Sequence, residues 1–375
     1  MNAAPEPYRK NRKWVRVLSG LLLILVLVPV FLTVAIQIPV VQNWAKNKVT
    51  NYASGRLGVE VRLDQVDLDI FQHIYLNGLY VASPYSGQDT LLTVSKFRVD
   101  LAAGLFSLLR KNLQIEDVQL QKLKATIIID STSNSFSKLM EKWNSVQVQN
   151  QDTTAGKPSS FKLSVHGIDC SDCEVKMVNH FNFSTQTFAF SDLALDAKTI
   201  DLKENEFEFK SFKATKPYVF IEKYGTGPDV VETEGLPPVF TDTLAKKPAQ
   251  FRIDHVILNE GHFQLEDRRY GPDGGGGIDY HHMDVTEIEL DADDLSIADL
   301  DFTGTLNQLT AKSTGGFMIR QLSCPQVSVT SKKVDLPGFQ LQTGKSLIQD
   351  TLRFYYQEYP DWLSFVDRVR MDFQI

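Results

Sequence analysis

The chain has 375 residues, of which 43% are hydrophobic and 23% are charged, and its net charge is −7 at neutral pH. The chain has 39 basic and 46 acidic residues, and five of the basic and one of the acidic residues precede the first long apolar segment. The remainder of the chain therefore has 34 basic and 45 acidic residues, a net charge of −11. This excess of acid argues against nucleic acid as a partner, because nucleic-acid binding depends on basic patches, and against adhesion to an anionic membrane surface. With three cysteines, the chain is not a small disulfide-stapled scaffold, so packed apolar surface must stabilise it.

The first predicted element is a transmembrane helix over residues 17–38, which would anchor the chain. No charged side chain occurs between Arg16 and Lys46, and about 20 apolar residues cross a bilayer core of about 30 Å. A cleaved export signal, cut near Ala35, is the alternative, although such a signal needs a shorter apolar core. The predicted anchor residues are Leu21, Leu22, Leu23, Ile24, Leu25, Val26, Leu27 and Phe31.

A basic tail over residues 1–16 precedes this anchor. Positively charged flanks stay in the cytoplasm, so the tail is expected to be cytoplasmic and the long remainder to be exported. The residues that set this topology are Arg9, Lys10, Arg12, Lys13 and Arg16.

A juxtamembrane amphipathic helix is predicted over residues 39–58. Pro39 suits the first turn of a helix, and glycines at 55 and 58 suit its end. Between them, six residues recur at three- and four-residue spacing, and Trp44 is expected at the height of the membrane interface. The residues of this series are Val41, Trp44, Lys48, Val49, Tyr52 and Ala53.

After this helix the apolar period changes to two, and six segments share a template of eight residues. Each segment is apolar at positions 1, 3, 6 and 8. A helix would scatter these positions over opposite faces, whereas a strand with one extra residue at its centre keeps them on one face. The segments are 61–68, 92–99, 113–120, 163–170, 207–214 and 278–285.

Repeated bulges curl a sheet, so residues 59–375 are predicted to be mostly β, as an elongated, curved antiparallel sheet with one apolar face. A second layer, the sheet curled on itself, or an apolar ligand must cover that face. About twenty strands spaced at about 4.8 Å would make a rod about 95 Å long.

Three further features interrupt the strands. Helical spacing predicts a short helix near 135–146, and polar or proline-containing composition predicts loops near 147–160 and 224–249. The stretches 113–127, 163–177 and 251–265 are similar in sequence, and each is predicted to form a strand, a short turn and a second strand. The separations between the three stretches are unequal, so they indicate a reused supersecondary unit and not a solenoid of fixed period.

No arrangement of residues predicts chemistry. Cys170 and Cys173 have the spacing of a redox or half-zinc motif, but no second such pair follows, so two unpaired strand residues are the simplest interpretation and a local disulfide the alternative. His255 and His262 lack a defined set of further metal ligands, and the acidic run 291–294 is typical of a solvated strand. Without a catalytic serine motif either, we expect a protein that is not an enzyme and that binds no metal and no cofactor.

The quoted residues "VVQNWA", "GRLGVEV", "LNGLYV", "LFSLL" and "IEDVQL", all within 15–130, resemble the N-terminal region of the AsmA-like superfamily. The resemblance is to the inner-membrane subunit of the translocation and assembly module (TamB) of Bacteroidota-type bacteria. Beyond 130 it rests on repeated "I-x-x-V-x-L" units and on 341–354. Members of this type generally continue far beyond the length of this chain, so a truncated C-terminus is expected.

The resemblance implies a single-pass protein of the inner membrane whose bulk is a periplasmic β-groove with a greasy interior. It implies transport of phospholipid toward the outer membrane, with phospholipid acyl chains and the inner membrane as partners and an outer-membrane barrel partner reached through a missing C-terminal region. The alternative is an assembly or translocation factor for outer-membrane β-barrel proteins or autotransporters. A sealed structural or adhesin-like sandwich is a third reading.

The period of the strands alone selects the residues expected to contact lipid, because it decides which side chains share the apolar face. In a groove, acyl chains would leave water for these side chains, which stabilises them without fixing their position. The lipid-contact candidates are Leu163, Val165, Phe188, Phe190, Phe207, Phe209, Phe251 and Ile253.

Overall fold

The structure is a computed structural model. It describes residues 38–68, 73–85, 90–102, 112–130, 133–149, 162–201, 205–225, 249–272, 279–299, 301–357 and 369–374. The basic tail and, apart from Ile38, the whole predicted anchor lie outside the described residues. Within them, neither helix has the length and apolar character needed to cross a membrane.

Strands dominate the described chain, as the sequence predicts, and they form one mixed sheet of 17 strands. Two helices accompany it, α2 (Pro39–Leu57) and α4 (Ser135–Gln149). The strands are β1 (Val61–Arg62), β2 (Gln65–Leu68), β3 (His73–Ala82), β4 (Thr90–Leu101), β5 (Asn112–Gln121), β6 (Lys124–Ile129), β7 (Lys162–Asn179), β8 (Ser184–Asp201), β9 (Glu206–Thr215), β10 (Tyr218–Lys223), β11 (Gln250–Asp267), β12 (His282–Ala298), β13 (Asp301–Ser313), β14 (Met318–Val329), β15 (Lys333–Thr343), β16 (Leu347–Tyr355) and β17 (Arg370–Gln374).

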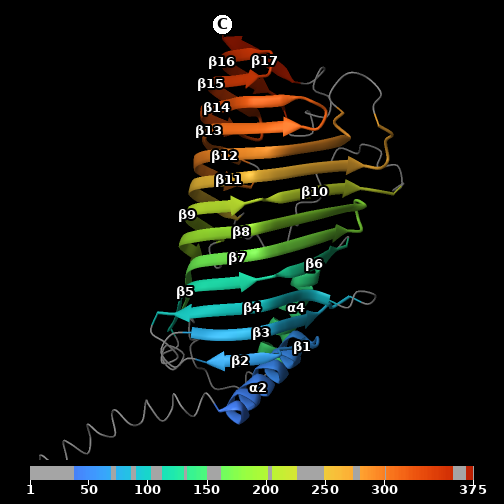
Figure 1. The fold of residues 1–375 in the computed structure, drawn as a ribbon, viewed down its shortest axis with the longest axis vertical. Coiled ribbons are helices and arrows are strands. Elements are labelled where there is room, and N and C mark those ends of the chain that lie inside the picture. The colour runs from blue at the N-terminus through green and yellow to red at the C-terminus, as the bar shows by residue number, and fades with distance from the viewer. Residues whose placement is uncertain are drawn as a thin grey trace, which may run out of the picture.

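The strands stack in chain order along the long axis of the molecule (Figure 1). Three pairs share one position each: β1 and β2 both pair with β3, β5 and β6 both lie between β4 and β7, and β9 and β10 both lie between β8 and β11. Seventeen strands less three shared positions leave 14 positions, whose 13 spacings of about 4.8 Å span about 62 Å. The predicted rod of about 95 Å is therefore too long for the described strands.

The prediction of a purely antiparallel sheet is wrong. β5 and β6 run parallel to β7, and β9 and β10 run parallel to β11. Parallel neighbours cannot be joined by a tight hairpin, and the connections here run through residues 130–161 and 224–249. Most of the two predicted loops, 147–160 and 224–249, lies outside the described residues, and residues 147–149 belong to α4. The similar stretches 113–127 and 163–177 consequently lie side by side and in register, from Leu113 beside Leu163 to Ile127 beside Met177.

Two bends divide the long strands and curve the sheet. The first falls at template position 4, where pairing between parallel neighbours is interrupted, at Glu116, His166, Lys210 and Asp254. The second falls at exposed residues with positive φ, a conformation that bends a strand sharply: Lys122, Asp172, Lys216, Glu260 and Glu287. The template therefore predicts the first bend, and the second was not predicted.

The pairing register aligns apolar residues across the whole sheet on one face, which we call the apolar face. One row of paired residues runs Val66, Leu76, Phe97, Leu120, Cys170, Leu193, Ala214, Leu258, Leu290, Leu309, Leu322, Leu341 and Ile348. The adjacent row on the other face is polar throughout: Gln65, Asn77, Lys96, Gln121, Ser171, Asp192, Thr215 and Asn259. Since alternate residues of a strand point to opposite faces, these two rows lie on opposite faces of the sheet, and the contrast between them extends from β2 to β11.

A sealed apolar core occurs at the helical end of the sheet. Val61 and Val81 of the apolar face are 7% exposed there, and they cluster with Leu91 and with Leu139 of α4. Ala53 and Leu57 of α2 pack against the same cluster. The two helices thus cover the apolar face beside β1 and β3, whereas most of its larger side chains further along are half-buried.

The helix predicted over residues 39–58 corresponds to α2, which spans Pro39–Leu57, and its apolar residues lie on two sides. Trp44 and Tyr52 are 63% and 58% exposed, while Ala53 and Leu57 of the same helix pack on the sheet. The apolar residues of α2 are therefore divided between the two sides of the helix, because only one side can contact β1 and β2.

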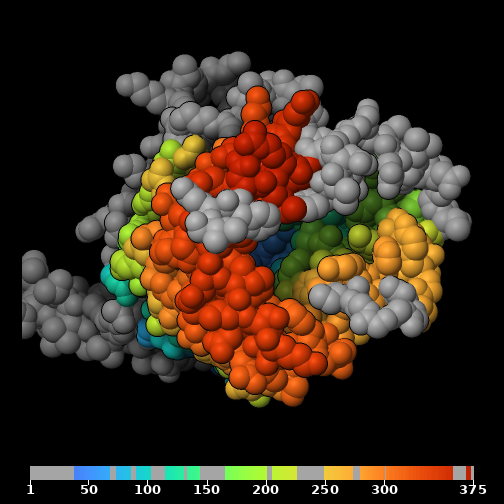
Figure 2. Space-filling model, turned by 90° about the horizontal axis from the view of Figure 1, so that it is seen from above, coloured from blue at the N-terminus to red at the C-terminus, as the bar shows by residue number. Residues whose placement is uncertain are grey.

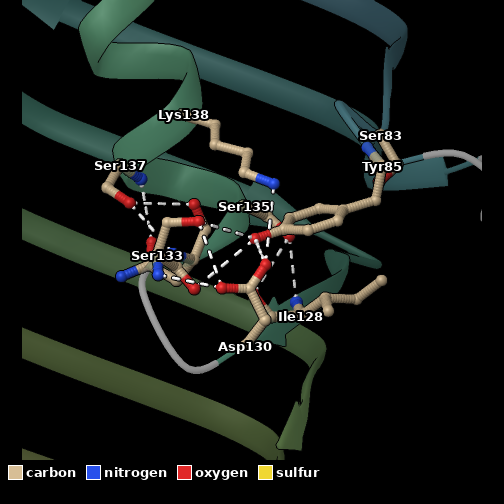
Figure 3. Close-up of polar contacts among 9 residues, drawn as sticks. Ser83, Tyr85, Ile128, Asp130, Ser133, Ser135, Ser137 and Lys138 are labelled. Carbon is tan, nitrogen blue, oxygen red and sulfur yellow. Dashed lines mark hydrogen bonds and ion pairs between the residues drawn. The ribbon is translucent and has the colours of Figure 1, made fainter. Parts of the chain in front are cut away.

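Polar contacts fix the N-terminus of α4 to the sheet. Asp130 lies at the centre of these contacts (Figure 3), where it accepts hydrogen bonds from Tyr85 Oη at 2.8 Å and from the Ser133 amide at 2.9 Å. The hydroxyl of fully buried Ser135 accepts a hydrogen bond from the backbone amide of Ile128 at 2.9 Å. Because these partners belong to β6 and to the segment after β3, α4 is held in one position over the end of the sheet.

Candidate functional site

The apolar face is hollowed between the middle strands and the C-terminal strands. Seen along the long axis, the surface encloses an opening within which green and blue atoms of earlier strands are visible (Figure 2). We call this hollow the trough. A cavity of about 580 Å³ lies in it, and its lining residues are Phe190, Phe212, Pro217, Val219, Ile253, Val256, Leu258, Leu290, Ala292, Leu295, Phe302, Gly304, Thr305, Leu306, Leu309 and Val327.

Paired rows of the sheet build the floor of this cavity. Leu258 pairs with Leu290, which pairs with Leu309. In the next row Ala292 pairs with Leu306. Side chains on the same face of neighbouring strands lie about 5 Å apart, so these rows leave no polar strip between strands.

The chemistry of the lining is almost wholly apolar. No titratable side chain belongs to it, and its single hydroxyl, of Thr305, donates to the carbonyl oxygen of Pro325 at 3.0 Å. Cys324, which pairs with Leu306, is 1% exposed, and burial raises the pKa of its thiol, so it stays protonated. A surface of this kind can hold apolar matter but offers no group for acid–base or nucleophilic chemistry.

Two of the eight predicted contact residues, Phe190 and Ile253, line the cavity. Phe209 pairs with Ile253, and Phe188 pairs with the lining residue Val219, so both lie in rows that continue into the cavity. Val165 is half-buried in β7 beside Ile115, away from this cavity. The side chain of Leu163 lies outside the described residues.

Phe207 and Phe251 form a stacked aromatic pair at the strand ends. Their ring centroids are 4.8 Å apart with an interplanar angle of 12°, and Phe251 is 37% exposed. Neither lines the cavity. Their row continues along the sheet through Ile297, Phe302, Val329, Val334 and Phe354, and of these Phe302 lines the cavity.

Sequence reasoning missed most lining residues, although some carried a signal. Phe212 occupies position 6 of the template segment 207–214, and Val256 and Leu258 occupy positions 6 and 8 of 251–258, which has the same apolar spacing except for Ile257. These positions lie on the same face as the chosen positions 1 and 3. Leu290 and Ala292 alternate with aspartates in a run that reads as solvated. Their face is set by pairing with β11, which the sequence does not reveal.

The expectation of two unpaired cysteines is wrong. Cys170 and Cys173 form a disulfide with Cα atoms 6.1 Å apart, and both are 4% exposed. The bridge spans Asp172, whose positive φ brings the two side chains to the same side of β7. The local-disulfide alternative therefore describes this pair, which stabilises the second bend.

On the opposite, polar face, His255, Asp291 and Asp293 bring potential metal-ligand atoms within 4.8 Å of one another. His255 Nδ1 lies 2.6 Å from a carboxylate oxygen of Asp293, and the Asn307 amide donates to both carboxylates at 2.9 and 2.7 Å. These hydrogen bonds lower the pKa of Asp293 and satisfy the group without an ion.

No protein-family model matches the chain, and no curated protein sequence matches it. The trough and its chemistry therefore carry the functional argument.

Proposed function

We propose that this protein binds the acyl chains of phospholipids in the trough and serves as a conduit for them. The proposal rests on one observation: apolar rows run from strand to strand along the sheet and line a cavity of about 580 Å³ that has no titratable side chain in its lining. Transfer of acyl chains from water to such a surface gains about 0.8 kcal/mol per CH₂ group. Because this attraction has no direction, the chains can slide along the rows.

Together with the resemblance of residues 15–130, the trough supports membership of the AsmA-like superfamily, as a TamB-type protein. In this proposal residues 17–38 anchor the chain in the inner membrane with residues 1–16 in the cytoplasm. The sheet then stands in the periplasm and carries phospholipid toward the outer membrane. The absence of ionisable groups from the cavity lining is consistent with a non-enzymatic role.

Photo-crosslinking in cells tests the proposal with a matched pair on one strand. A photoreactive residue in place of Ile253, in the cavity lining, is expected to capture phospholipid. The same residue in place of Ile257, which pairs with Lys213 and Asp291 on the polar face, should capture none. Mass spectrometry of the purified adducts identifies what is bound.

Lipid adducts in equal yield at both positions would contradict the proposal, and so would the absence of lipid adducts at both positions. Adducts of unfolded outer-membrane protein at Ile253, without lipid, would favour the assembly factor instead.

A further inference from the structure

The two helices present an exposed apolar surface at the helical end of the sheet. On α2, Val40, Trp44 and Tyr52 are 75%, 63% and 58% exposed. On α4, Phe136 and Met140 are 62% and 40% exposed. We call these five residues the helical platform. Large apolar side chains gathered in this way on two adjacent elements indicate a binding surface, in contrast to single exposed residues.

The platform is continuous between the helices. Tyr52 of α2 meets Trp143 of α4 edge to face, with ring centroids 6.2 Å apart. The Arg56 guanidinium lies 5.4 Å from the first ring and 5.7 Å from the second. Phe136, Met140 and Trp143 follow one another at four- and three-residue spacing, so they share one face of α4.

Other side chains hold the helices on the sheet, so the platform is not needed for folding. The Ser54 hydroxyl of α2 accepts the amide of Val61 at 2.9 Å. Leu139 of α4 is 6% exposed in the buried cluster, and Ala53 and Leu57 of α2 pack against that cluster. The contacts that hold the helices on the sheet are therefore made by residues other than those of the platform.

The charge of the helices is opposite to that of the chain. Although the whole chain carries −7, α2 has three basic residues and no acidic one, and α4 has two basic residues and one acidic residue, Glu141. The basic residues are Lys46, Lys48, Arg56, Lys138 and Lys142. The overall charge, which argues against adhesion to an anionic membrane, conceals this local reversal.

We propose that the helical platform binds the surface of an anionic phospholipid bilayer, with α2 and α4 lying in the interface. Exposed Trp, Tyr and Phe side chains beside lysines are the composition that such interfacial helices use. Basic residues near the surface add attraction to anionic lipid headgroups. The uncharged apolar segment 17–38 also ends directly before Pro39, the first residue of α2, so the chain itself delivers α2 to a membrane if that segment is embedded. The binding surface is separate from the trough and does not depend on what the trough holds.

Site-directed spin labelling of the full chain tests this inference. A nitroxide is attached at Phe136→Cys in protein reconstituted into vesicles of phosphatidylcholine with phosphatidylglycerol, and accessibility to oxygen is compared with accessibility to a water-soluble nickel chelate. Leu347→Cys is the matched control, because Leu347 is an apolar residue of β16 that is 58% exposed at the other end of the sheet. Both native cysteines at 170 and 173 are bridged, and Cys324 is buried.

The expected result is an oxygen-to-nickel ratio several-fold higher at 136 than at 347, with the difference lost in vesicles of phosphatidylcholine alone. Lys48→Glu, at an exposed position of α2, should reduce the ratio at 136, and Lys345→Glu at the far end should not. If labelling at 136 disturbs α4, Met140→Cys provides a second site on the same face.

Equal ratios at 136 and 347 would overturn the inference. Equal ratios at 136 in anionic and zwitterionic vesicles would overturn its electrostatic part. Position 136 could be shielded from nickel in native membranes but not in vesicles that contain this protein alone. That result would mean that a protein partner covers the platform, and it would also overturn the inference.

Discussion

Leu306 lies on the trough floor between Ala292 and Cys324, and its side chain is half-buried. Replacing it with Glu introduces a carboxylate that water can solvate in the empty trough. When an acyl chain covers the position, that carboxylate must lose its water or take up a proton. Leu306→Glu is therefore expected to fold and to bind phospholipid much more weakly.

The magnitude follows from two contributions. Covering the exposed half of a leucine gains about 1 kcal/mol, and the variant loses this gain. Protonating a glutamate of ordinary pKa, about 4.3, costs about 3.7 kcal/mol at pH 7 and about 1 kcal/mol at pH 5. Because a chain can shift to avoid the carboxylate, we expect at least a tenfold loss of affinity at pH 7, which is about 1.4 kcal/mol, and substantial recovery at pH 5.

The assay measures binding of a labelled phospholipid to the purified full chain at both pH values. Thr303→Glu is the control, because Thr303 is exposed on the polar face of the same strand between Ser296 and Ser328. Circular dichroism checks that both variants keep their strand content. Equal affinity of the two folded variants at pH 7 would refute the argument, and Leu309→Glu repeats the test one row away should the first variant misfold.

Three further outcomes concern stability. Replacing Cys170 and Cys173 together by Ser removes a short closed loop and should lower the free energy of unfolding by about 2 kcal/mol, seen as a lower Tm; no change would exclude a stabilising role at the bend. Gly78→Ala places a methyl group 1.9 Å from a carboxylate oxygen at φ of 63°, so it should cost at least about 1 kcal/mol. Arg269 hydrogen-bonds Asp267 and lowers the pKa of that carboxyl; this stabilisation is present above the carboxyl's ordinary pKa and is lost as pH falls through the depressed value. The Tm deficit of Arg269→Gln should therefore be largest near neutral pH and shrink in strong acid.

The local pattern of the sequence predicted the strands, the first bend and part of the apolar face, as at Phe190 and Ile253, which line the cavity. Those features depend on residues close together in the chain. The alternation of apolar and polar residues along a strand therefore indicates them directly.

Features that depend on pairing between distant residues were not predictable in this way. Two neighbouring strands run parallel when a crossover joins them and antiparallel when a hairpin does, and no short stretch of sequence encodes that choice. Leu290 was missed because its orientation follows from its partner Leu258, while its own neighbours are acidic. The disulfide depends on the positive φ of Asp172, which the Cys-Ser-Asp-Cys spacing does not reveal.

Most of the larger apolar side chains beyond the helical end are half-buried, and this has a calorimetric consequence. In a compact protein, unfolding newly wets most apolar side chains and raises the heat capacity by about 12–15 cal/mol/K per residue. Here many of those side chains are hydrated before unfolding begins, so the increment per residue should be smaller. Ligand bound in the trough would exclude water from these side chains and raise the heat-capacity increment of unfolding. The increment would therefore report how much ligand the protein holds.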